Sequence, residues 1–480
     1  MKTRLRKMNV PIKVLGSLLI FSTSCTSPQK QSMKASVGTP QETETKTVSL
    51  MGKRGIVKHS FEDELKPFQN SYLTLPANYT GPSFELKHDY PEHASKGKKH
   101  PWKAVTKDGR ITKKNANDYV LALKEYVSAD MEKMLFDYEN WNQKKAQWWE
   151  SIWLGSQREP IHGMYVGSGF AAHTLSPQQV DLTTFVFTLY DRTSAVTLNN
   201  IWGTDLKNAE QPNLSSAEAA QFAEGSVIIK YAFVTADGEQ WPDMDGAATW
   251  TIYTDVDPAT GAPTGNQPQM MDLSLMQFDI IVKDSKAAPE TGWVFSTLVY
   301  DKDAPGKNAW DKMVPLGATW GDNPDIISVE GSAVEAPVKV NKMLSQNWIN
   351  MNTPDYTRST LGWDGRLSGP NDGAVVNNAT TTTGVKYDNL ASAGCLGCHS
   401  SAQYTFESFL LPGYTDDNGL TMYNPGSDEW MKWFQNRDGK LAMDPGKGQI
   451  GLDYDMVTAF KAIPLWQEAM DQKNTVLSKK

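Results

Sequence analysis

Residues 395–399 read Cys-Leu-Gly-Cys-His, and this short stretch constrains the chain more than any other. The pattern Cys-x-x-Cys-His is the attachment site of a c-type haem. Two thiols at this spacing suit one helical turn and can add across the two vinyl groups of a porphyrin. A histidine directly after them can present a ring nitrogen to the iron. The motif therefore predicts one covalent haem c, attached through Cys395 and Cys398, with His399 as an axial iron ligand.

Two other kinds of site also use paired cysteines. A thioredoxin-like redox pair normally follows a strand, and residues 388–392 lack a strand pattern. A structural zinc site needs four ligands, and a chain with 3 cysteines has no second cysteine pair to supply them. Both alternatives stay open from the sequence, but a haem fits it better.

The first 25 residues have the order of an export signal. Basic residues precede a short apolar core at residues 14–21, and small residues then lead to Cys25. This order resembles a bacterial lipoprotein signal, in which the cysteine is lipidated and begins the mature protein. Ser22 stands where such signals usually carry leucine, so an ordinary secretory signal cut nearby is the alternative.

The other N-terminal expectations follow from this signal. Residues 26–55 are polar, and we expect a disordered tether between the anchor and the body. Thr26, rather than the aspartate that retains such proteins at the inner membrane, follows Cys25. The chain is therefore predicted to be lipid-anchored in a bacterial cell envelope, at the outer membrane and facing the periplasm. Export and haem attachment agree, because c-type haem is attached outside the cytoplasmic membrane.

Charge and hydropathy limit the partners. The net charge is −8, which argues against nucleic acid as a partner. No internal run reaches the roughly 18 apolar residues of a transmembrane helix. The expected partners are thus a redox protein and, through the lipid anchor, a membrane.

Residues 56–340 are predicted to form a domain with a helix and a β-rich region. Apolar residues recur at helical spacing from Ala116, and the pattern extends toward Trp149. Five later stretches alternate with period two, at 184–190, 227–234, 249–254, 276–282 and 293–300. Because no long helix pattern separates them, we expect an antiparallel sandwich or barrel.

Residues 341–480 are predicted to be a separate, mainly α, cytochrome c-type haem domain. Helical patterns begin at Val338 and near Leu452, and Pro464 should interrupt the second one. A haem iron that only transfers electrons usually has a second axial ligand, often methionine. Met443, in a loop with a nearby proline ahead of the last helix, is our first candidate. The alternatives are Met422, Met431, Met456 and Met470.

The haem motif, a methionine loop and a final helix follow one another as in class I cytochromes c, which this region resembles. Residues 158–163, 292–295 and 361–370 are similar to stretches in a bacterial family of secreted single-haem cytochrome c-like proteins, here with a lipoprotein signal. This resemblance implies haem and export. It implies no substrate.

Three functions remain open from the sequence. The leading hypothesis is electron transfer in the periplasm or at the outer membrane. The alternative is a haem enzyme or a sensor of peroxide or gas, with an open axial site facing the β-rich domain and His162, His173 or an arginine as distal acid or base. A third hypothesis is that the β-rich domain binds a carbohydrate or another ligand. Whether the protein is an enzyme is left undecided.

Overall fold

The computed structural model describes residues 71–477, apart from 87–88, 96–98, 108, 204–211, 324, 326–333, 405–409, 417–418 and 444–448. The predicted export signal, Cys25 and the tether lie outside the described residues. None of the described helices combines the length and apolarity that a membrane span requires.

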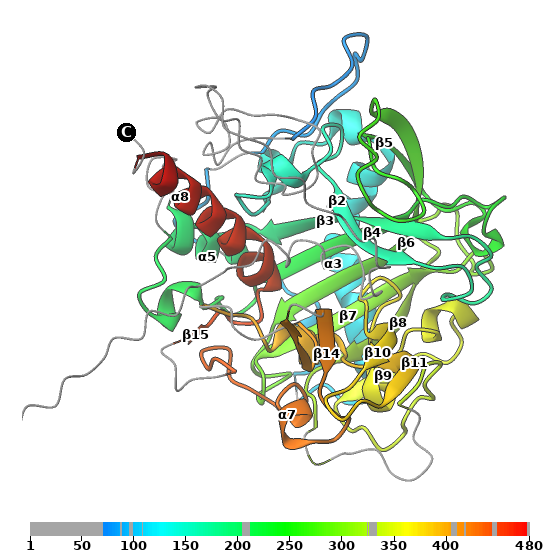
Figure 1. The fold of residues 1–480 in the computed structure, drawn as a ribbon, viewed down its shortest axis with the longest axis vertical. Helices are drawn as coiled ribbons and strands as arrows, with labels where there is room; N and C mark the ends of the chain where they lie inside the picture. The colour runs from blue at the N-terminus through cyan, green and yellow to red at the C-terminus, as the bar shows by residue number, and fades with distance from the viewer. Residues whose placement is uncertain are drawn as a thin grey trace, which may run out of the picture.

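Nine strands form one large antiparallel sheet (Figure 1). Along the sheet the order is β1-β3-β4-β6-β7-β8-β9, while β2 also pairs with β3 and β5 with β6. The strands are β1 (Trp148–Trp149), β2 (Tyr165–Phe170), β3 (Leu182–Asp191), β4 (Val227–Val234), β5 (Thr249–Thr254), β6 (Gln269–Lys283), β7 (Trp293–Tyr300), β8 (Met313–Thr319) and β9 (Asn347–Ile349). All five predicted strands are confirmed. In the part of the chain that is described, however, the sheet is a single open layer and not a sandwich or a barrel.

One face of the sheet is covered by α3 (Ala116–Phe136), which lies behind the strands in Figure 1. Apolar side chains of α3, among them Leu123 and Met131, share a buried cluster with Ile229 of β4 and Phe278 of β6. The predicted start of this helix is confirmed, but the helix ends at Phe136. The tryptophans at 148 and 149 belong to β1 instead.

The opposite face is covered by the C-terminal part of the chain. The haem motif forms α6 (Cys395–His399), and the last helix is α8 (Ile463–Leu477), preceded by a π-helical turn over Val457–Ala462. Residues of these segments share a second buried cluster with Tyr190 and Phe295 of the sheet. Pro464 is the second residue of α8, next to the point where the π-helical turn changes into an α-helix. The sheet and the haem motif are therefore parts of one packed body.

The prediction of a mainly α C-terminal unit is wrong. Strand pairs dominate the region around α6, and the helices other than α8 are short. The pairs are β10 (Val375–Thr380) with β11 (Lys386–Ala391), β12 (Gln403–Tyr404) with β15 (Ile450–Gly451), and β13 (Gly413–Asp416) with β14 (Gly419–Met422). The remaining helices are α2 (Trp102–Val105), α4 (Gln143–Ala146), α5 (Arg192–Trp202) and α7 (Asp428–Met431).

Tertiary contacts explain this difference. Trp363, Trp430, Trp433 and Phe434 form a separate buried cluster with residues of β10 and β11. These two strands do not alternate between buried and exposed residues, so periodicity does not reveal them. The predicted helix at residues 338–348 is absent as well. Its last residues belong to β9, because Asn347 and Trp348 pair with β8.

Candidate functional site

The haem motif forms the short helix α6, as the spacing of its residues predicts. Cys398 N donates to Gly394 O at 3.1 Å, and Cys395 N donates to Leu367 O at 2.9 Å. Neither of these two cysteines is joined in a disulfide, and the side chain of Cys395 is buried. A single helical turn therefore presents two thiols and an imidazole.

His399 is held in the orientation that a metal ligand needs. Its Nδ1 lies 2.8 Å from the backbone oxygen of Tyr454. A protonated Nδ1 donates to this oxygen, which leaves the lone pair of Nε2 for a metal. Burial lowers the pKa of His399 to about 4, so the ring is neutral at pH 7.

The backbone that offers this oxygen has an unusual conformation. Asp453 and Tyr454 both have positive φ, at 47° and 68°. Each such residue costs on the order of 1–3 kcal/mol, and this kind of strain is concentrated at functional sites. The hydrogen bonds of two carboxylates, Asp453 and Asp455, offset this cost on either side of Tyr454. Asp453 Oδ1 accepts hydrogen bonds from Lys283 Nζ at 2.7 Å and Trp293 Nε1 at 2.8 Å.

Asp455 provides the second anchor of this segment. Its Oδ1 accepts a hydrogen bond from the Tyr190 hydroxyl of β3 at 2.9 Å, and its Oδ2 accepts one from Thr458 Oγ1 at 2.6 Å. Burial raises the pKa of Asp455. The sheet thus fixes the residues on either side of Tyr454, and Tyr454 orients His399.

His399 lines a cavity of about 230 Å³ between the sheet and residues 453–461. Part of the wall is apolar and includes Ile281, Phe295 and Phe460. The phenyl ring of Phe295 lies 4.7 Å from the imidazole of His399, measured between ring centroids. Ligand pockets usually measure about 300–1,000 Å³, so only part of a porphyrin attached to α6 fits inside.

A largely buried charge network borders the cavity through Lys230 and Asp372. Lys230 Nζ of β4 lies 2.7 Å from Asp279 Oδ2 and 2.5 Å from Asp372 Oδ1. Burial lowers the pKa of Lys230, but the two carboxylates outweigh this effect and raise the pKa above its ordinary value. Lys230 is therefore charged. Cys395 Sγ lies 3.9 Å from Asp372 Oδ2, which connects the network to the haem motif.

These residues fit a haem c by the chemistry of their donor set. Cys395 and Cys398 are not joined in a disulfide and carry the thiols that thioethers require, and Nδ1 of His399 already has an acceptor. The described residues contain no group of three or more His, Cys, Asp or Glu side chains that could hold a metal ion.

Met443, the first candidate for the sixth ligand, does not line the cavity of His399. Its side chain is buried in the cluster of Trp363 and Trp430, against which Cys398 also packs. Among the methionines considered from the sequence, Met456 lines the cavity, and its Sδ lies 3.9 Å from Ser401 Oγ. The structure thus brings Met456, and not Met443, to the side of His399 that faces the cavity.

The two histidines proposed as acid or base also lie elsewhere. The ring of His162 stacks on Trp250, with 4.2 Å between ring centroids. Trp250 belongs to the buried cluster on the α3 side of the sheet. His173 lines a different cavity. Sequence reasoning instead missed Lys230 and Asp279. Their signal was present, since Lys230 is the one charged residue of β4 and Asp279 stands directly between Phe278 and Ile280 in β6.

Comparisons with known proteins add nothing to this picture, because no family model, curated protein or solved structure matches the chain. The resemblance to class I cytochromes c and to secreted single-haem proteins stays a prediction.

Proposed function

We propose that the protein is an exported single-haem c-type cytochrome that transfers electrons in the bacterial cell envelope. The observation that carries this proposal is the arrangement of α6, where two thiols outside any disulfide share a helical turn with His399 and the backbone oxygen of Tyr454 engages Nδ1. This is the arrangement by which proteins orient a histidine toward a metal.

The residues of the chain have distinct roles in this proposal. Cys395 and Cys398 attach the porphyrin, and His399 holds the iron through Nε2. A bound haem supplies a centre that accepts and releases one electron. Phe295 and the other apolar residues of the cavity would exclude water from the histidine side of a bound haem.

The cellular setting is part of the proposal. A lipid on Cys25 would anchor the protein, most simply at the outer membrane facing the periplasm. The redox partner would dock transiently, since electron-transfer contacts are usually small.

A haem enzyme or a sensor of peroxide or gas is the second candidate. One observation favours it: ionisable groups line the cavity of His399, namely the Tyr190–Asp455 pair and the ion pair of Lys230 and Asp372. Such groups can donate hydrogen bonds to a small ligand or move protons.

Visible spectra of the full chain, expressed with a haem-attachment system, test haem binding. We expect a covalent haem in the wild type that is lost in Cys395→Ala/Cys398→Ala. Cys25→Ser is the matched control, because it removes the remaining cysteine, and it should keep the haem while losing membrane association. A wild-type protein without covalent haem would overturn the proposal.

The spin state separates the two candidates. Electron transfer requires a low-spin oxidised spectrum, and a Met–iron band would be assigned by comparing Met456→Leu with Met443→Leu. A high-spin iron that readily binds carbon monoxide would instead support the enzyme or sensor.

A further inference from the structure

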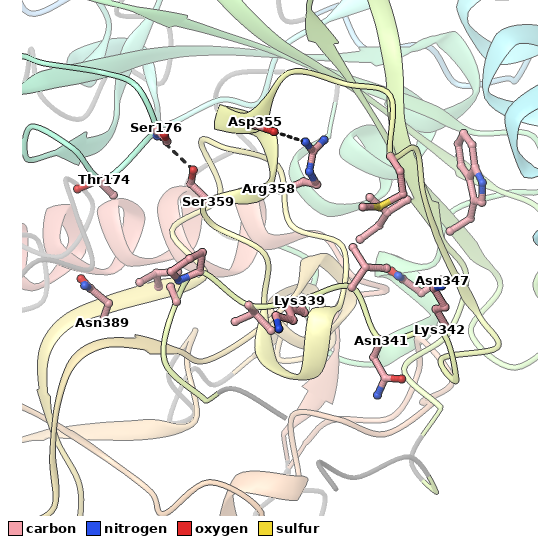
Figure 2. A pocket seen from close by; sticks show the side chains of 18 of the residues that line it. Thr174, Ser176, Lys339, Asn341, Lys342, Asn347, Asp355, Arg358, Ser359 and Asn389 are labelled. Carbon is pink, nitrogen blue, oxygen red and sulfur yellow. Dashed lines mark hydrogen bonds and ion pairs between the residues drawn. The ribbon is translucent and has the colours of Figure 1, made fainter. Parts of the chain in front are cut away.

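A second cavity lies apart from the haem motif, and no residue lines both cavities. Its volume is about 1030 Å³, which lies at the upper end of the range of small-molecule sites. It lies where Lys113 and the loop at Thr174 and Ser176 meet residues 336–359 (Figure 2). A hydrogen bond between Ser176 N and Ser359 Oγ, 3.2 Å long, joins the two sides.

Part of the cavity wall is apolar. Val338, Val340, Trp348 and Met351 contribute to it. Met351 is 58% exposed, which is unusual for a large apolar side chain. An apolar group that enters the cavity can therefore cover surface that is now in contact with water.

The charged residues of the cavity are mostly cations. Lys113, Lys339, Lys342 and Arg358 line it, against one carboxylate, Asp355. In Figure 2, Arg358 lies next to Asp355 in the upper part of the view, whereas Lys339 and Lys342 lie below them. This is a local excess of positive charge in a chain of net charge −8.

Two of these cations are already engaged. Arg358 Nη2 donates to Asp355 Oδ1 at 2.5 Å, and Lys113 Nζ donates to the backbone oxygen of Lys342 at 2.8 Å. The ammonium groups of Lys339 and Lys342, in contrast, have no ion-pair or hydrogen-bond partner among the residues that the structure describes. They are available to an anion from outside.

We propose that this cavity binds a small organic anion with an apolar body, of the class of medium-chain carboxylates. The apolar wall takes the chain, and Lys339 and Lys342 take the head group through charge-assisted hydrogen bonds. The proposal is independent of the haem, because none of its residues belongs to the site of His399.

Calorimetric titration of the full haem-loaded chain with octanoate tests the proposal. Octanoate should bind at one site, and octylamine, which has the same chain and the opposite charge, should bind at least about tenfold more weakly. Octyl phosphate distinguishes a carboxylate site from a phosphate site with the same cations. No binding of octanoate or octyl phosphate up to about 10 mM, or equal binding of octylamine, would overturn the proposal.

Variants locate the site on the molecule. Lys339→Ala/Lys342→Ala should weaken octanoate binding about tenfold or more, since two charge-assisted contacts are lost. Lys386→Ala, at an exposed lysine outside the cavity, should leave it unchanged. Octanoate binding that survives in the double variant would place the site elsewhere.

A second pair of variants tests the apolar wall. Met351→Asp places an acid inside the cavity at an exposed position and should also weaken octanoate binding about tenfold. Met343→Asp is its control, because Met343 is 65% exposed and does not line the cavity. Equal affinities of these two variants would contradict the proposed position of the chain.

Discussion

The two faces of the large sheet are built from the same strands but differ in chemistry. On the face toward α3, Ile229 and Phe278 lie in an apolar cluster. On the opposite face, their direct neighbours Lys230 and Asp279 form a largely buried ion pair. Successive side chains of a strand point to opposite sides, so one strand can build a core and a polar site together.

This difference indicates what each face is for. An apolar core is the simplest way to stabilise a sheet, whereas a buried ion pair often contributes no more than apolar residues of the same volume. The face toward α6 carries such charges and also the positive φ values of Asp453 and Tyr454. Stability alone does not explain these features, but a site that must orient His399 does.

The largest expected effect is on the charged face. Lys230→Met should lower the free energy of unfolding by about 3–5 kcal/mol, because Asp279 and Asp372 lose their buried counterion. Urea denaturation measures this. Lys386→Met, at an exposed lysine, should change stability by no more than about 0.5 kcal/mol. A similar small effect of Lys230→Met would mean that solvent screens the network.

The adjacent residue on the apolar face gives the direct comparison. Ile229→Ala should destabilise the protein by about 2–5 kcal/mol through lost burial and a cavity in the core. Because Ile229 does not line the cavity of His399, the visible spectrum should not change. An altered spectrum would show that the two faces are not independent.

A smaller effect is expected at the anchor of Asp455. Tyr190→Phe removes one hydrogen bond to a buried carboxyl group and should cost about 1–2 kcal/mol in urea denaturation. Tyr253→Phe is the control, because the Tyr253 hydroxyl has no hydrogen-bond partner among the described residues. If both variants behave alike, the bond between Tyr190 and Asp455 does not stabilise the segment.

A pH-dependent effect on stability is expected from His162, which stacks on Trp250 on the α3 side of the sheet. Burial lowers the pKa of His162 from 6.5 to about 3. Between these two pH values the unfolded chain binds a proton at His162 that the folded protein does not bind. Stability from this group is present above pH 6.5 and is lost as the pH falls, by up to about 1.4 kcal/mol per pH unit. His162→Phe should reduce this slope in urea denaturation between pH 6.5 and about 4.5. An unchanged slope would show that His162 is accessible to protons in the folded state.

The sequence by itself determined the local features. The spacing of Cys395, Cys398 and His399 specified a helical turn, because neighbours three and four residues apart share one face of a helix. Alternation of apolar residues likewise located strands such as Thr249–Thr254. These signals depend only on residues close together in the chain.

Only the tertiary structure decided how these elements combine. Lys230 and Asp372 are 142 residues apart, and His399 and Tyr454 are 55 apart, so no local pattern pairs them. The same holds for Met456 beside the cavity, for the single sheet layer, and for the short strand pairs around α6. Their positions depend on which surfaces bury each other, and this is settled by the packing of the whole chain.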